Sequence, residues 1–224
     1  MQDEYNTIAN WDVYMPLAMR SRKDMPTYEA HLMHAALGIG DEVGELQDAF
    51  LRDMIGIPQA DNLGNLRTAA IVECGDLLWY LALVSNTLQD MSDDTEQSEW
   101  QFVLDDLDRT PLAPTSSAAV YRNLNQMFPE KQSTGRVDNY LKLVASSCGN
   151  LVGLIKKREI YGKELLEGAL IGAWAEAVIA VEAFITHCLD CSLEEVLSTN
   201  ITKLHDRYPA KYSDWHANAR LDVV

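Results

Sequence analysis

The chain has 224 residues, of which 47% are hydrophobic, and a formal net charge of −16. So acidic a surface repels nucleic acid and anionic membranes, which argues against DNA or RNA as a partner. The first residues have no basic region and no apolar region, so we expect no secretory signal, and the chain has no uninterrupted run of about 18 apolar residues. We therefore expect a cytoplasmic protein that neither spans nor binds a membrane.

The four cysteines are too few for a disulfide scaffold, although Cys188-x-x-Cys191 has the spacing of a zinc or redox pair. No second Cys pair accompanies it, and so buried or idle thiols are the better interpretation.

Helical periodicity dominates the sequence, and no convincing alternating strand is present. Pro26 and Thr27 open a first long helix, in which apolar residues recur at steps of three and four from Leu32 to Phe50. Residues 55–64 have the composition of a loop. A second helix is expected from about Asn65 to Leu88, and the pattern as a whole predicts an all-α helical bundle.

The rest of the chain is also expected to be helical after a less regular stretch. A short acidic helix is expected at 96–107 and a linker at 110–117. Three helices follow, near 137–158, 163–190 and 193–207. Ser192 begins a capping box for the last of them, and Tyr208-Pro209 ends it.

Two pairs of acidic residues are the most informative feature of the chain: Glu42-x-x-Glu45 and Glu73-x-x-Asp76. The i, i+3 spacing places both carboxylates of a pair on one face of a helix, about 5–6 Å apart at Cβ. Two such helices, packed together, would direct four carboxylates at one point. Carboxylate oxygens are typical ligands of Mg²⁺ and of similar hard cations, so this arrangement predicts a divalent-metal site.

The second half of the chain repeats this pattern weakly, without the acids. Val43-Gly44-Glu45-Leu46 aligns with Val152-Gly153-Leu154-Ile155, so that Glu42 corresponds to Leu151 and Glu45 to Leu154. A shorter loop would match Glu73 with Trp174 and Asp76 with Ala177. We therefore expect two related helix pairs, of which the second has lost its metal ligands.

The second half carries basic residues instead. Lys156 and Lys163 bracket one helix end, and Asn200, Lys203 and Arg207 share a face of the last helix. A solvated basic edge would explain them equally well in isolation. Next to a cluster of carboxylates, phosphate binding becomes the better interpretation.

Together these motifs resemble the MazG-like, all-α nucleoside triphosphate pyrophosphatases, a family that includes dimeric dUTPases and dCTP pyrophosphatases. The resemblance rests on the two acidic motifs with their flanking Gly, Leu and Trp-Tyr residues, and on Ile155-Lys156-Lys157 and the Asn200 to Pro209 tail. It covers roughly residues 30–88 and 140–210.

The resemblance implies Mg²⁺-dependent hydrolysis of a nucleoside or deoxynucleoside triphosphate to the monophosphate and pyrophosphate, in nucleotide-pool control or housecleaning. Mn²⁺ would be an alternative cation. Glu42, Glu45, Glu73 and Asp76 would be the metal ligands and the catalytic residues. The implied substrate contacts are Tyr80, Lys156, Lys163, Asn200, Lys203 and Arg207.

The chain departs from the family in where its acidic and basic motifs lie, since each half carries only one kind. The acids lie in residues 1–108, a linker would span 109–136, and the basic tail lies in 137–224. We expect a fused pseudo-dimer with one composite site, built as two units or as one compact domain. Such chains could also form a homo-oligomer.

Two other classes of protein share parts of this pattern. A di-iron bundle needs Glu-x-x-His pairs, and no histidine of this chain lies three residues after a glutamate. A non-catalytic nucleotide sensor or regulatory interaction protein on the same fold is the serious alternative. Base and sugar preference cannot be read from these motifs.

Overall fold

The computed structural model describes residues 8, 11–60, 63–92, 135–164 and 167–219. All regular secondary structure in these ranges is helical, as the periodicity predicted. In chain order they are α1 (Trp11–Met19), α2 (Tyr28–Ile55), α3 (Leu66–Ser92), α6 (Gly135–Glu159), α7 (Glu167–Phe184), the π-helix η2 (Ile185–Leu189), α8 (Leu193–Arg207) and α9 (Asp214–Ala219). The predicted acidic helix at 96–107 and the linker at 110–117 lie outside the described residues.

Local capping explains where the long helices begin and end. The Thr27 side chain accepts a hydrogen bond from the Ala30 amide at 3.2 Å, which fixes the start of α2. Gly56 ends that helix in the left-handed conformation, with φ of 72°. The Ser192 hydroxyl likewise accepts from the Glu195 amide at the start of α8. These boundaries agree with the sequence prediction to within one or two residues.

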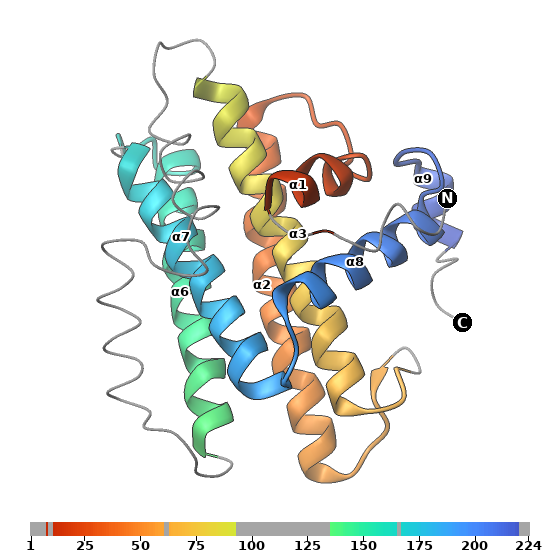
Figure 1. The fold of residues 1–224 in the computed structure, drawn as a ribbon. Helices are drawn as coiled ribbons and strands as arrows, with labels where there is room; N and C mark the ends of the chain where they lie inside the picture. Colours follow the sequence, from red (N-terminus) through yellow and green to blue (C-terminus); the bar gives the residue numbers. More distant parts are fainter. Residues whose placement is uncertain (1–7, 9–10, 61–62, 93–134, 165–166, 220–224) are drawn as a thin grey trace.

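Four long helices form the centre of the molecule. The pairs α2–α3 and α6–α7 pack side by side, with α2 against α6 and α3 against α7 (Figure 1). One cluster of buried apolar residues runs through both pairs, from Leu32 and Leu77 to Leu151 and Trp174. The shorter helices α1 and α8 contact α3 and each other, so they cover one side of α3.

Two of the central helices are more apolar than the sequence analysis allowed for. Segments Leu66–Met91 and Gly168–Leu189 are long and apolar enough to cross a membrane by length and composition, although charged residues interrupt both of them. In the structure 78% and 67% of these two apolar windows is buried against the rest of the chain. The apolar character is therefore used in packing inside the bundle.

Helix α1 was not predicted. Pro16 lies inside it, and its nine residues are too few for a clear periodic stripe. Even so, Trp11, Tyr14 and Ala18 are buried at helical spacing, and the Trp11 ring packs edge-on against Trp174 with centroids 5.6 Å apart. This contact ties the N-terminal part of the chain to α7.

Candidate metal centre

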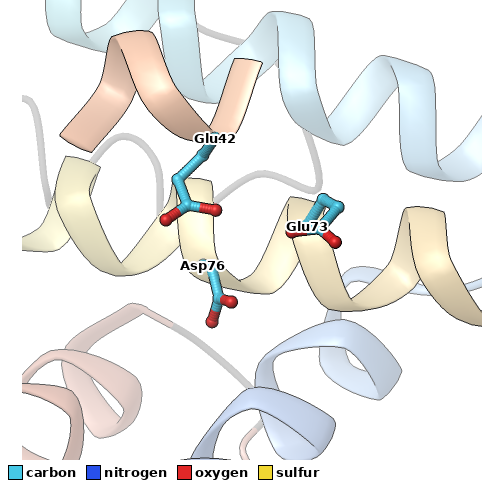
Figure 2. Close-up of side chains that lie close together, drawn as sticks. All are labelled: Glu42, Glu73 and Asp76. Atoms are coloured by element: carbon cyan, nitrogen blue, oxygen red, sulfur yellow. The ribbon is translucent and has the colours of Figure 1, made fainter. Parts of the chain in front are cut away.

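Three carboxylates converge between α2 and α3. Glu42 extends from α2, and Glu73 and Asp76 extend from successive turns of α3, as Figure 2 shows. One oxygen of each lies within 4.8 Å of the others. The i, i+3 spacing of the second pair therefore produces the convergence that the sequence predicted for these three side chains.

Glu45 lies at the edge of this group. Glu45 is exposed, and its side chain hydrogen-bonds with the Glu73 side chain. It is not one of the three acids whose oxygens lie within 4.8 Å. Its role as a fourth ligand remains a prediction, and its hydrogen bond to Glu73 keeps it within reach of the cluster.

The cluster is electrostatically strained when no cation is present. Burial, and then the neighbouring Asp76 and Glu45 charges, raise the pKa of Glu42 to about 9. Burial and the Asp76 charge raise the pKa of Glu73 to about 8. The Oε2 atom of Glu42 is buried and has no hydrogen-bond partner. Crowded, buried oxygens of this kind fit a hard divalent cation, which would satisfy the orphaned atom and offset the repulsion.

Helix α8 supplies the polar partners of Asp76. The Asn200 Nδ2 atom donates to Asp76 Oδ1 at 2.9 Å, and the Lys203 ammonium forms an ion pair with Asp76 Oδ2. Tyr14 of α1 in turn donates its hydroxyl to Asn200 Oδ1 at 2.8 Å. Residues from the C-terminal half thus reach the acidic cluster of the N-terminal half, and a residue of α1 holds one of them in place.

Gly75 allows α8 to approach this closely. A methyl group at this position would lie 3.0 Å from Asn200 Cβ and 3.2 Å from its Nδ2 atom. Asn200 is buried, and its side-chain amide is held by hydrogen bonds with Asp76 and Tyr14, so it cannot move aside freely. A side chain at position 75 would therefore push α8 away from α3.

We expect Gly75→Ala to destabilise the protein by about 1–2 kcal/mol, since overpacking outweighs the roughly 1 kcal/mol that alanine gains in helix propensity. Urea unfolding would measure the change. Gly172→Ala is the matched control, because Gly172 lies exposed on α7 with no atom within 4 Å of the added carbon. That variant should be neutral or more stable. Equal effects of the two substitutions would contradict the steric argument.

The other predicted basic residues lie in different places. Arg207 is half-buried on α8, one turn beyond Lys203. Lys156 and Lys163 are exposed at the end of α6, where the neighbouring Arg158 contacts Met91. Met91 is 15 residues from Asp76 on α3, which corresponds to about 22 Å along the helix. The structure therefore does not bring these two lysines to the carboxylates, and their contact with substrate stays a prediction.

Only some of the residues that surround Tyr80 could be predicted from the sequence. A pocket borders Asp76 and is walled by Trp79, Tyr80, Tyr208 and Tyr212, with His34 and Lys23 at its polar side. Trp79 and Tyr80 belong to the Trp-Tyr pair after the second acidic motif, and Tyr208 belongs to the C-terminal tail motif. No motif pointed to Lys23, His34 or Tyr212, which come from three further segments of the chain.

Comparisons of the chain with protein-family models, with curated proteins and with solved structures found no match.

Proposed function

We propose that this protein hydrolyses a nucleoside or deoxynucleoside triphosphate to the monophosphate and pyrophosphate with the help of Mg²⁺. The observation that carries the proposal is the convergence of Glu42, Glu73 and Asp76, with Lys203 of α8 at the same point. Carboxylates that hold a cation next to a fixed ammonium group are suited to a polyphosphate, which needs charge neutralisation from both.

Each side chain has a distinct part in this proposal. Glu42, Glu73 and Asp76, with Glu45 at the edge, would hold the cation. When bound, Mg²⁺ would lower the pKa of a water molecule and neutralise charge on the phosphates. Lys203 would stabilise the charge that develops on the phosphate oxygens, and Asn200 would keep Asp76 oriented through its 2.9 Å hydrogen bond.

We further propose that α2–α3 and α6–α7 are two MazG-like repeats that form a pseudo-dimer within one chain. In the second pair, the positions matched to the acids carry apolar side chains, and Leu151, Trp174 and Ala177 are buried. Trp174 also donates its indole N–H to the Leu81 carbonyl at 2.8 Å. Its packing against α3 supports a scaffold role for this pair, with α8 completing a single site.

The direct test is a panel of NTPs and dNTPs incubated with Mg²⁺, followed by identification of the products. We expect the nucleoside monophosphate and pyrophosphate, because cleavage falls between the α- and β-phosphates in the proposed reaction. Omission of the cation should abolish turnover.

Two other results would contradict this proposal. Release of a nucleoside diphosphate and orthophosphate would indicate a different class of hydrolase. Tight, Mg²⁺-dependent nucleotide binding without any turnover would favour a nucleotide-sensing or regulatory protein.

A further inference from the structure

The pocket beside Asp76 is lined mainly by aromatic side chains. Its volume is about 160 Å³, and Trp79, Tyr80, Tyr208 and Tyr212 contribute aromatic surface. Aromatic faces of this kind stack on any heterocyclic base. Because Asp76 belongs to both the pocket and the acidic cluster, a molecule in the pocket would have its polar end at the carboxylates.

The aromatic walls are held by specific contacts. A side chain at Gly38 would overlap the Tyr80 ring, with the added carbon 2.2 Å from ring atoms, so the glycine lets that ring lie against α2. Tyr80 packs edge-on against Trp79 and His34, with centroids 4.9 and 5.6 Å apart. The Trp79 indole N–H donates to Ala18 O and Ser21 Oγ, both at 3.0 Å. These walls are therefore preorganised.

Contacts between two segments that lie far apart in the sequence hold Lys23 at the pocket lining. The Lys23 ammonium donates to Asp214 Oδ1 at 2.7 Å and lies 5.5 Å from the Tyr212 ring centroid. Tyr212 donates its hydroxyl to the same carboxylate oxygen at 2.8 Å, and its amide donates to Arg20 O. The Lys23 ammonium also hydrogen-bonds with the Tyr212 side chain. A lysine ammonium carries three N–H donors and no acceptor, so one donor remains for a ligand.

We propose that this pocket holds the base of the nucleotide and that Lys23 selects bases with a carbonyl oxygen at the edge facing it. The proposal rests on the function proposed above and adds the class of substrate. Lys23 can donate to a carbonyl, as in uracil, thymine or guanine. An exocyclic amino group, as in cytosine or adenine, is itself a donor, so it cannot accept a hydrogen bond from the Lys23 ammonium.

Binding of two non-hydrolysable analogues with Mg²⁺ tests this inference without requiring turnover. α,β-Methylene dUTP and α,β-methylene dCTP differ in the base at position 4, which carries a carbonyl in the first and an amino group in the second, and at the adjacent N3 atom, which carries a proton only in the first. Calorimetry should show that the natural protein binds the uracil analogue at least about tenfold more tightly than the cytosine analogue. The expected difference is modest because the Lys23 side chain is half exposed. In Lys23→Met and Lys23→Gln, this preference should disappear.

Lys142→Met is the matched control, because Lys142 pairs with Asp138 on the exposed face of α6 in the same kind of ion pair. It should leave the preference unchanged. Equal binding of the two analogues by the natural protein would overturn the inference. Equal weakening of both analogues in the Lys23 variants would also overturn it, because Lys23 would then attract only the phosphates. Preferential binding of the uracil analogue without hydrolysis of any triphosphate would contradict the proposed reaction and leave base selection standing.

Discussion

Replacing Glu42 by glutamine is expected to lower turnover by roughly 10²–10³-fold while leaving a folded protein of equal or slightly higher thermal stability. Glutamine keeps the shape of the side chain but cannot offer a charged oxygen to a cation. The fold should tolerate the change because the raised pKa of Glu42, about 9, means that the buried side chain is mostly uncharged near neutral pH in the absence of metal. Steady-state kinetics and thermal unfolding in EDTA would measure the two effects.

Asp76→Asn should reduce turnover to a similar extent but should also reduce stability, since Lys203 then loses its charged partner on α8. Glu176→Gln on the exposed face of α7 serves as the control and should change neither quantity. Retention of most of the activity in both Glu42→Gln and Asp76→Asn would rule out the carboxylate cluster as the catalytic centre.

The second large effect concerns pH. An unfolded glutamate ionises near pH 4.5, whereas the pKa values of Glu42 and Glu73 in the folded chain are about 9 and 8. Between these limits the folded state binds more protons than the unfolded state, so the free energy of unfolding falls as pH rises. The contribution of these two glutamates to the free energy of unfolding is fully present below about pH 4.5 and is lost progressively toward pH 8–9. We expect a loss of several kcal/mol, or on the order of 10 °C in Tm.

Added Mg²⁺ should oppose this loss, because the cation favours the ionised carboxylates and binds more tightly as they lose their protons. Thermal unfolding between about pH 5 and 9, in EDTA and in Mg²⁺, would show the two curves diverging as pH rises. A Glu42→Gln, Glu73→Gln double variant should give a flatter curve that Mg²⁺ does not move. A smaller slope should persist from Glu182, whose burial on α7 raises its pKa to about 7. Parallel curves with and without Mg²⁺ in the natural protein would contradict cation binding at these acids.

Much of the helical framework could be predicted from the sequence because its signals are local. The apolar stripe of α2 with its Thr27 cap, and the i, i+3 spacing of Glu73 and Asp76, depend only on residues a few positions apart. Helix α1 was missed because Pro16 and its short length hide a buried face that forms only against other helices.

The surroundings of the acids were harder to predict because they depend on tertiary packing. Lys203 and Lys156 looked equally suitable as phosphate contacts in the sequence. Only the crossing of α8 over α3 separates them, since it places Lys203 at Asp76. The Lys23, Tyr212 and Asp214 contacts likewise join segments about 190 residues apart, as the 191-residue separation of Lys23 and Asp214 illustrates. Nothing in one sequence reports such a pairing.

The Tyr14–Asn200–Asp76 connection has a consequence for the order in which the protein matures. Its hydrogen bonds join residues separated by 186 and 124 positions. During synthesis, α2 and α3 leave the ribosome well before α8, so the first helix pair has to exist for several seconds without Asn200 and Lys203, at about 5–20 residues per second. A nascent chain of this length would hold crowded carboxylates without their basic counterpart. Protons or a cellular cation would have to neutralise them until translation reaches α8, so the site is among the last parts of the molecule to be completed.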